Sequence, residues 1–288
     1  TDAEMLEIID LAVALKQRRA SGVRGDLLHR RQIALIFEKS STRTRCAASV
    51  AAREEGGSAE YLARGDIHLG VKESVADTAR VLGRMFDGIL FRGFSQQMAE
   101  ELARHSGVPV WNGLTDAFHP TQVLADLMTV RERFGKLKGL TLAYVGDGRN
   151  NMANTLMVGC AKSGMNFVNC TPAELMPDAD LVNGIRPLAE ANGGQIRIEN
   201  DPRKGVRGAR ILYTDVWVSM GEEAQQSMRM NTLRPYQVNR KLIQATDLPE
   251  SELLFLHCLP AFHDNQTAIT RETGALEVSD EVFEAPFS

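Results

Sequence analysis

Short apolar runs of strand length alternate along the sequence with longer segments that have helical patterning. The apolar runs span residues 33–37, 59–62, 87–91, 108–113, 140–145, 165–170, 195–198, 211–214 and 253–256. The segments at 4–17, 46–55, 75–85 and 123–128 have the spacing or composition typical of helices. Because alternating strands and helices build parallel sheets, the pattern predicts an α/β protein with a parallel sheet in each half.

A composition shift marks the middle of the chain. The segment Gly135–Gly139 combines glycines with lysines and interrupts the apolar pattern, and domain boundaries commonly fall in such segments. A chain of 288 residues is long enough for two domains. We therefore expect one domain over residues 1–134 and another over residues 135–288. Each is expected to be doubly wound, with a central parallel sheet flanked by helices, and the helix before the boundary should join them.

Composition and charge narrow the range of functions. The net charge of -4 and the absence of a basic run argue against nucleic acid as a partner. The four cysteines lie far apart without a Cys-x-x-Cys pair, which fits a reducing compartment and gives no zinc framework. No apolar run reaches the length of a membrane span, and the acidic start is unlike a signal or transit peptide. We therefore expect a cytoplasmic enzyme with no membrane partner.

A strand, a turn and a helix start are predicted over residues 33–55, and together they indicate an anion site. The apolar run is followed by Ser41-Thr42-Arg43-Thr44-Arg45 and then by an alanine-rich segment. The first turn of a helix offers free backbone N–H groups and the positive end of its dipole, so hydroxyls and an arginine there can bind phosphate. In the simpler alternative, Ser41 only caps the helix and the arginines are solvated. Two arginines favour the anion site, because a cap gains nothing from cations at the positive end of the dipole.

This five-residue motif resembles the carbamoyl-phosphate-binding signature of the aspartate and ornithine carbamoyltransferases. The resemblance implies that Ser41, Thr42 and Arg43 hold the phosphate of carbamoyl phosphate. It also implies that Thr44 lies near the carbonyl oxygen. The remaining motifs must then distinguish between the aspartate and the ornithine enzymes.

The loop over residues 64–74 is rich in glycine and charge, which is typical of a mobile surface loop. In the family that this chain resembles, the corresponding loop reaches into the active site of a neighbouring subunit and contributes a lysine to the phosphate, and Lys72 matches that lysine. His68 stands where the family has glutamine, and Val71 where it often has histidine, although His68 can still donate a hydrogen bond to phosphate. The resemblance thus implies a homotrimer with shared active sites.

Two further motifs in the first half carry candidate ligands. Arg92 follows an apolar run and precedes a glycine, at the position where open α/β sheets place ligand groups; a surface salt bridge is the alternative. His119-Pro120-Thr121-Gln122 opens a predicted helix, and a capping or core histidine is the alternative there. Both resemble fixed family motifs. This implies that Arg92 contacts the carbonyl oxygen and the phosphate, His119 the carbonyl oxygen, and Gln122 the carbamoyl amide.

The second half supplies candidates for the amino-acid substrate. The turn Gly146–Asn151 lacks the third glycine of a dinucleotide fingerprint, so nicotinamide binding is the weaker interpretation. In the family this turn presents an asparagine to the amino acid, and Asn151 matches it. Asp215 within Asp-Val-Trp, with Ser219 and Met220 within Ser-Met-Gly, resembles the ornithine enzymes. A carboxylate and a hydroxyl suit the ammonium and carboxylate groups of ornithine, whereas a helix-capping role is the alternative for Asp215.

The last apolar run opens into His257–His263, and this His-Cys-Leu-Pro-Ala-Phe-His string closely resembles the ornithine enzymes. A buried cysteine is usually a small hydrophobe, but the resemblance implies that Cys258 lies beside the substrate amine. It also implies a cis bond between Leu259 and Pro260, with the Leu259 carbonyl aimed at the carbamoyl NH₂. The candidate catalytic residues are therefore Arg92, His119, Asp215 and Cys258.

The resemblance as a whole implies that the δ-amine of L-ornithine attacks carbamoyl phosphate to give L-citrulline and phosphate, with no cofactor and no metal required. A carbamoyltransferase for putrescine or acetylornithine, a non-catalytic paralogue that binds carbamoyl phosphate and, less favoured, an NAD-dependent oxidoreductase stay open as alternatives. The motifs serve arginine biosynthesis and arginine breakdown equally, and they leave the proton acceptor open. A C-terminal Glu-Asn-Arg-Met-His helix of the family is not among these 288 residues, and weak activity is expected of an enzyme that lacks it.

Overall fold

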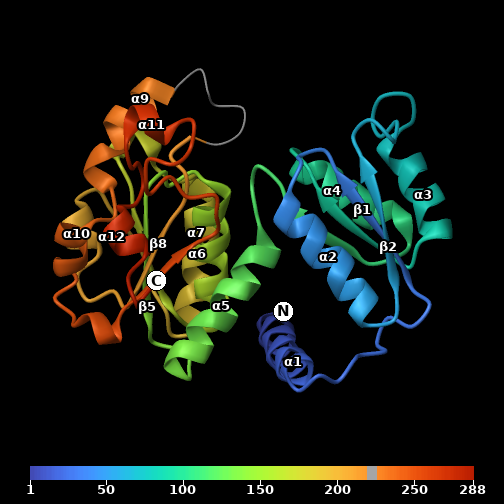
Figure 1. The fold of residues 1–288 in the computed structure, drawn as a ribbon, viewed down its shortest axis with the longest axis horizontal. Helices are drawn as coiled ribbons and strands as arrows, with labels where there is room; N and C mark the ends of the chain where they lie inside the picture. The colour runs from blue at the N-terminus through green and yellow to red at the C-terminus, as the bar shows by residue number, and fades with distance from the viewer. Residues whose placement is uncertain (219–225) are drawn as a thin grey trace. The chain divides into compact units, whose positions relative to one another are not determined.

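The computed structural model describes residues 1–218 and 226–288. Contacts divide the chain into two compact units (Figure 1). The amino-terminal unit comprises Glu7–Gln122, and the carboxy-terminal unit comprises Thr1–Leu6 together with Val123–Ser288. Two helices, α1 (Asp2–Ala20) and α5 (Pro120–Phe134), contain the points at which the chain passes from one unit to the other. The predicted boundary after residue 134 is the last residue of α5, and it stays a prediction.

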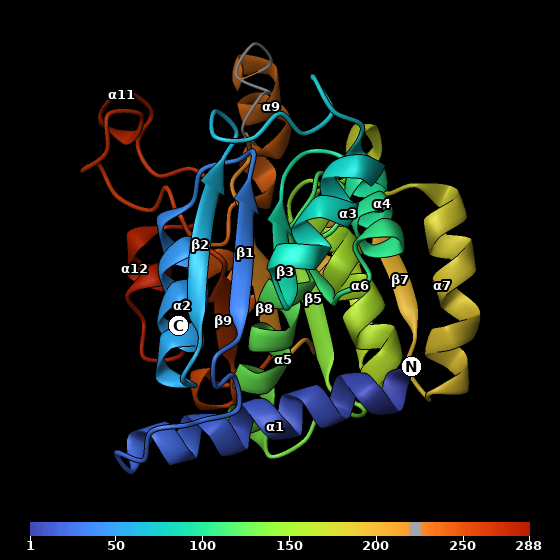
Figure 2. The ribbon, with the colours of Figure 1, turned by 90° about the vertical axis from the view of Figure 1, so that its right-hand side faces the viewer.

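The amino-terminal unit, described over its whole length, is built on a four-stranded parallel sheet in the order β2-β1-β3-β4. Its strands are β1 (Gln32–Phe37), β2 (Ser58–Ala63), β3 (Gly88–Arg92) and β4 (Val110–Leu114). Its further helices are α2 (Thr42–Glu54), α3 (Val75–Met85) and α4 (Gln96–Ser106). Figure 2 shows β1 and β2 side by side and running in the same direction.

The sequence of β1 explains why helices cover both faces of this sheet. Side chains alternate between the two faces of a strand. Ile33, Leu35 and Phe37 accordingly pack in the cluster that includes α2, whereas Ala34 and Ile36 pack in the cluster that includes α3 and α4. A strand that is buried on both faces is apolar at almost every position, which is why it appears in the sequence as an unbroken run.

The described residues of the carboxy-terminal unit contain a five-stranded parallel sheet in the order β7-β6-β5-β8-β9. Its strands are β5 (Thr141–Val145), β6 (Asn166–Cys170), β7 (Ile196–Glu199), β8 (Ile211–Thr214) and β9 (Leu254–His257). Its helices are α6 (Asn151–Ser163), α7 (Ala179–Ala191), α8 (Pro202–Gly205), α9 (Gln226–Leu233), α10 (Arg240–Gln244), α11 (Thr270–Thr273) and α12 (Asp280–Phe283). Each of the apolar runs in the sequence overlaps one of the strands β1 to β9, so the prediction of two parallel sheets flanked by helices is confirmed.

The strand orders decide which loops can share a site. All strands of a parallel sheet end at the same edge, and ligands of open α/β sheets bind at that edge. The loops that follow β1, β3 and β4 therefore gather at one edge of the first sheet, because these three strands are neighbours. The loops that follow β5, β8 and β9 gather in the same way at one edge of the second sheet.

The helix α1 begins within the carboxy-terminal unit. The carboxylate of Asp2 accepts hydrogen bonds from Lys162 Nζ and Asn192 Nδ2, each at 2.8 Å, which fix the start of the helix on α6 and on the end of α7. Within the described parts of the chain, α1 included, there is no helix long and apolar enough to cross a membrane.

Candidate active site

Three loops at one edge of the first sheet carry the predicted carbamoyl-phosphate ligands. The loop after β1 leads into α2 with the motif Ser41–Arg45, β3 ends in Arg92, and the segment after β4 leads to His119 at the start of α5. Because β1, β3 and β4 are neighbours, the fold brings together residues that are up to 78 positions apart in the sequence.

The motif forms the first turn of α2, and Ser41 is its N-cap. The Ser41 Oγ accepts a hydrogen bond from the Thr44 N–H at 3.3 Å and lies 3.2 Å from the Thr44 Oγ1. Capping and anion binding are compatible, because Thr42 and Arg43 are exposed and this first turn contains no acidic residue. The helix start therefore presents hydroxyls, N–H groups and a cation, which suits a phosphate.

Arg92 is only 7% exposed although it carries a charge. Its Nη1 lies 3.5 Å from the Thr44 Oγ1 and 3.4 Å from the carbonyl oxygen of Gly113, and both oxygens can accept hydrogen bonds. A guanidinium at the buried edge of the sheet is a strong partner for an anionic ligand. The guanidinium of Arg45 instead lies over the Tyr61 ring, 3.8 Å from its centroid, in a cation–π contact.

His119 is neutral in the folded protein. Burial, and then the nearby charge of Arg92, lower its pKa from 6.5 to about 3. A neutral imidazole has one N–H donor, so His119 can donate to a carbonyl oxygen without bringing a positive charge. Its Nδ1 lies 3.5 Å from the Thr121 Oγ1. Gln122 lies in the same first turn of α5 and is half-buried.

The loop between β2 and α3 holds the other two predicted phosphate ligands. His68 and Lys72 are exposed, and neither side chain has a hydrogen-bond or ion-pair partner among the described residues. The loop closes on itself through its backbone, since the N–H groups of Val71 and Lys72 donate to the carbonyl oxygen of His68 at 3.0 and 3.2 Å. The two side chains are thus available to a ligand, and their roles stay predictions.

At the edge of the second sheet, the loop after β5 ends in two asparagines, Asn150 and Asn151, at the start of α6. The Asn150 Oδ1 accepts the N–H of Met152 at 2.7 Å and caps the helix. Asn151 is the first residue of α6 and is half-buried. Asn150 therefore has a structural role in the helix start, and Asn151 as the candidate ligand stays a prediction.

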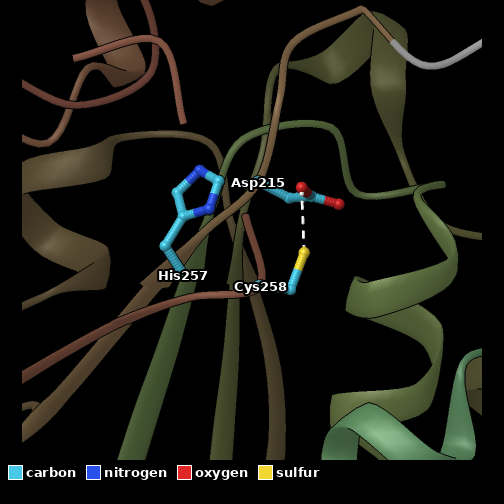
Figure 3. Close-up of side chains that lie close together, drawn as sticks. All are labelled: Asp215, His257 and Cys258. Carbon is cyan, nitrogen blue, oxygen red and sulfur yellow. Dashed lines mark hydrogen bonds between the residues drawn. The ribbon is translucent and has the colours of Figure 1, made fainter. Parts of the chain in front are cut away.

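Asp215 and Cys258 lie against each other at the ends of the neighbouring strands β8 and β9 (Figure 3). The Cys258 thiol donates to the Asp215 Oδ1 at 3.2 Å, and the same oxygen accepts the Val216 N–H at 2.8 Å. Burial raises the pKa of Asp215 above its ordinary value. Burial and the adjacent carboxylate raise the pKa of Cys258 well above 9, so the sulfur is a thiol and not a thiolate at neutral pH. In this pair, a neutral thiol donates a hydrogen bond to a carboxylate whose pKa is raised.

A buried contact between His257 and Glu277, which the sequence did not indicate, holds the chain on both sides of Cys258. The Leu259 N–H donates to His257 Nδ1 at 2.9 Å, so the imidazole proton is on Nε2 and donates to the Glu277 Oε1 at 3.2 Å. That oxygen also accepts the Phe262 N–H at 2.7 Å. Glu277 is fully buried and lies twenty positions after His257; its only sequence signal is an acidic residue between two apolar ones. The prediction of a cis Leu259–Pro260 bond is confirmed.

The predicted ligands Ser219 and Met220 lie outside the described residues. Arg229, a buried residue that follows them in the chain, binds Trp217, which precedes them. Arg229 donates from Nε to the Trp217 carbonyl oxygen at 2.7 Å and from Nη2 to the carboxylate of Asp147. Burial opposes ionisation of Asp147, but hydrogen bonds from Arg149 and Arg229 outweigh it and lower its pKa.

The donor atoms of Asp215, His257 and Cys258 lie within 4.8 Å of one another, which is close enough for a shared metal ion. Both nitrogens of His257 already make hydrogen bonds, and the Cys258 proton is held by Asp215. A metal would therefore have to displace one of these contacts and deprotonate the thiol. The arrangement suits a hydrogen-bonded network better than a metal site.

Comparison with known proteins identifies the family to which this chain belongs. The carbamoyl-P binding domain of the aspartate/ornithine carbamoyltransferases matches residues 1–132, and their Asp/Orn binding domain matches residues 138–288. The chain belongs to the aspartate/ornithine carbamoyltransferase family. The resemblance inferred from the motifs is thereby confirmed, and the candidate phosphate ligands fall in the first of the two family domains.

Relatives within the family are close in sequence and structure. The catabolic ornithine carbamoyltransferase of Bacillus licheniformis is 52% identical over 100% of this chain and 87% of its own length, and that of Enterococcus faecalis is 51% identical over 99% and 86%. The ornithine carbamoyltransferase structure from Pyrococcus furiosus has a TM-score of 0.92 at 40% identity, covering 100% of this chain and 87% of that one. The corresponding structure from Gloeobacter violaceus has a TM-score of 0.83 at 41% identity with the same coverage.

Proposed function

We propose that this chain is an enzyme that transfers the carbamoyl group of carbamoyl phosphate to the δ-amine of L-ornithine, giving L-citrulline and phosphate. The observation that carries the proposal is the identity of 51–52%, over nearly the whole chain, to proteins named ornithine carbamoyltransferase. The buried carboxylate of Asp215 is a suitable partner for an ammonium group of ornithine.

In this proposal the amino-terminal unit holds carbamoyl phosphate. The phosphate ligands are Ser41, Thr42, Arg43 and, from a neighbouring copy of the chain, His68 and Lys72. Arg92, His119 and Thr44 donate hydrogen bonds to the carbonyl oxygen, and Gln122 contacts the carbamoyl amide. Negative charge develops on that oxygen as the tetrahedral species forms, so fixed donors around it make the largest contribution to the rate. Arg92 supplies charge there, and the neutral His119 supplies a donor without competing with Arg92 for the anion.

The carboxy-terminal unit holds ornithine in the same proposal. The amino-acid ligands are Asn151, Asp215, Ser219 and Met220. Cys258 lies beside the attacking amine, and the carbonyl oxygen of Leu259 accepts a hydrogen bond from the carbamoyl NH₂. The hydrogen bond from Cys258 to Asp215 fixes the direction of the thiol. The δ-amine of ornithine therefore binds next to a carboxylate and a sulfur that are already oriented.

The reaction requires the amine to lose a proton before it attacks. With a lysine-like pKa of about 10.4, deprotonation at pH 7 costs about 4.6 kcal/mol. Asp215 can accept this proton, because burial raises its pKa and makes it a better base than an ordinary aspartate. The neutral amine then attacks the carbonyl carbon, and the tetrahedral species expels phosphate, which can also accept a proton.

The proposal extends to assembly, location and pathway. A homotrimer is supported by the loop that contains Lys72, because its side chains at His68 and Lys72 are exposed and can reach a neighbouring subunit. A cytoplasmic location is supported by the four free cysteines. Several relatives are named catabolic, which supports a role in arginine breakdown over biosynthesis.

An assay for the ureido product, run with a panel of amines, tests the proposed activity. The full chain is incubated with carbamoyl phosphate and, separately, with L-ornithine, putrescine or N-acetyl-L-ornithine. We expect turnover with ornithine only. Faster turnover with another amine would transfer the proposal to that substrate. Binding of carbamoyl phosphate without turnover of any amine would favour a non-catalytic paralogue instead.

A further inference from the structure

Lys39 is a buried cation beside the carbamoyl-phosphate motif that the proposed mechanism does not use. It lies two residues after β1 and two residues before Ser41, and it is only 9% exposed. A buried ammonium group is costly unless it is paired. Its Nζ forms an ion pair with the carboxylate of Asp116 and lies 4.5 Å from the centroid of the Phe94 ring, within the range of a cation–π contact.

The two partners of Lys39 are also bound to each other and to the residue next to it. The Asp116 N–H donates to the carbonyl oxygen of Phe94 at 2.9 Å. The Phe94 N–H donates to the Glu38 carboxylate at 3.1 Å. Phe94 is therefore held by its N–H, its carbonyl oxygen and its ring at once. A Cβ added at Gly93 would come within 2.2 Å of the same Glu38 carboxylate, so this carboxylate lies directly against the backbone that precedes Phe94.

These contacts connect the three loops that carry the proposed carbamoyl-phosphate ligands. Lys39 belongs to the loop after β1, Phe94 to the loop after β3, and Asp116 to the loop after β4. Each is two or three positions from a proposed ligand: Lys39 from Ser41, Phe94 from Arg92, and Asp116 from His119. The contacts all lie within the amino-terminal unit, at the carboxyl ends of neighbouring strands.

We propose that Lys39 is a positioning residue that binds Asp116 and Phe94 to hold the three ligand loops at fixed spacing for carbamoyl phosphate. The inference rests on the proposed function and assigns a role to a residue outside the proposed ligand set. Lys39 acts through its neighbours, so its loss leaves every ligand in the protein but lets the loops move apart. Displacing a catalytic or binding group by about 1 Å can cost up to about a hundredfold in rate.

A different role for Lys39, direct attraction of the phosphate by its charge, gives the opposite result when Asp116 is changed. Asp116→Asn keeps the lysine and removes a negative charge close to it. If Lys39 attracted the anion directly, this variant would bind carbamoyl phosphate as well as the wild type or better. If Lys39 acts through Asp116, the variant weakens binding, as Lys39→Met does.

The chain offers a matched control at the other end of the same strand. Arg31 immediately precedes β1 and pairs with Asp87, which precedes β3, at 2.6 Å. Arg31→Met therefore also removes a cation from an ion pair between the flanks of β1 and β3, but at the edge away from the ligand loops. It should leave catalysis unchanged, because exposed ion pairs contribute little.

The test compares Lys39→Met, Asp116→Asn, their double variant and Arg31→Met in the full chain. We expect KM for carbamoyl phosphate to rise about tenfold or more in both single variants, with little change in KM for ornithine, and the double variant to be no worse than the worse single one. Lys39→Arg, which preserves the ion pair, should recover part of the loss. Calorimetric titration with inorganic phosphate gives a second readout that needs no turnover, and its Kd should rise in the same order.

Two results would overturn the inference. One is a Lys39→Met enzyme whose KM and phosphate Kd match those of Arg31→Met. The other is tighter binding in Asp116→Asn, which would assign Lys39 a direct electrostatic role. If Lys39→Met fails to fold, the Asp116→Asn variant decides, since its carboxylate is 63% exposed and its removal disturbs the core least. Absence of citrulline formation by the wild type would instead refute the proposed function, and the phosphate titration would still test Lys39.

Discussion

Replacing Glu277 with glutamine tests whether the buried contact with His257 holds the loop that contains Cys258. The Glu277 side chain is fully buried, and one of its oxygens accepts hydrogen bonds from His257 Nε2 at 3.2 Å and from the Phe262 N–H at 2.7 Å. Glutamine has the same shape and keeps an acceptor oxygen but loses the charge. Hydrogen bonds to charged groups contribute about 1.5–3 kcal/mol and neutral ones about 0.5–1.5 kcal/mol, so the two bonds together should lose about 2 kcal/mol.

Scanning calorimetry measures this loss directly. A change of about 2 kcal/mol in the free energy of unfolding should lower Tm by about 4–8 °C in a unit of this size. Citrulline formation should fall as well, because the Leu259 N–H donates to the same imidazole and Cys258 lies between His257 and Leu259 in the chain.

Glu281→Gln is the matched control for this variant. Glu281 pairs with Arg240 at 2.7 Å, but its side chain is 63% exposed, and exposed pairs contribute about 0–1 kcal/mol. We expect this variant to melt within about 3 °C of the wild type and to keep its activity. A Glu277→Gln protein with the Tm and activity of Glu281→Gln would show that the buried carboxylate does not hold the loop.

Three further predictions concern individual side chains of the two units. Arg92→Met should lower kcat/KM in an initial-rate citrulline assay by the equivalent of about 3 kcal/mol, as expected for loss of one oxyanion donor; an unchanged value would contradict its role. His119, with a pKa of about 3, should show no titration by NMR between about pH 8 and about pH 5, and a midpoint near 6.5 would contradict its burial as a neutral group. Because only the unfolded state takes up this proton below pH 6.5, the group's contribution to stability should fall as the pH falls from 6.5 towards 3. At neutral pH, iodoacetamide should alkylate the exposed Cys46 before Cys258, whose thiol pKa is raised by burial and Asp215; peptide mapping by mass spectrometry that found the reverse order would refute this.

Local patterns were sufficient to predict the sheets and the cap at the start of α2. The unbroken apolar run of β1 reflects burial on both faces, and the hydroxyl at Ser41 reflects the need of α2 for a cap. Both signals act over a few residues, so both can be read without knowing the fold. The order of strands in each sheet has no such local signal, and the unit boundary within α5 has none either.

Contacts between distant positions could not be derived from the residues alone. Asp215 and Cys258 are 43 positions apart and meet because β8 and β9 are neighbours; only the family resemblance indicated that they share a site. Glu277 belongs to no motif. It contacts His257 only because the segment after α11 packs against the end of β9. Lys39 likewise stands beside a recognisable motif, but its partner Asp116 is 77 positions away.

The most direct test of the proposed reaction follows the transferred carbon by NMR. The full chain is incubated with ¹³C-labelled carbamoyl phosphate and L-ornithine labelled with ¹⁵N at the δ-amine, beside an enzyme-free control. We expect the ¹³C signal of the citrulline ureido carbon to appear with one-bond coupling to the δ-nitrogen, far faster than in the control and much more slowly with Arg92→Met. A label that stays in carbamoyl phosphate and its breakdown products, or coupled product formed no faster than in the control, would contradict carbamoyl transfer to ornithine by this protein.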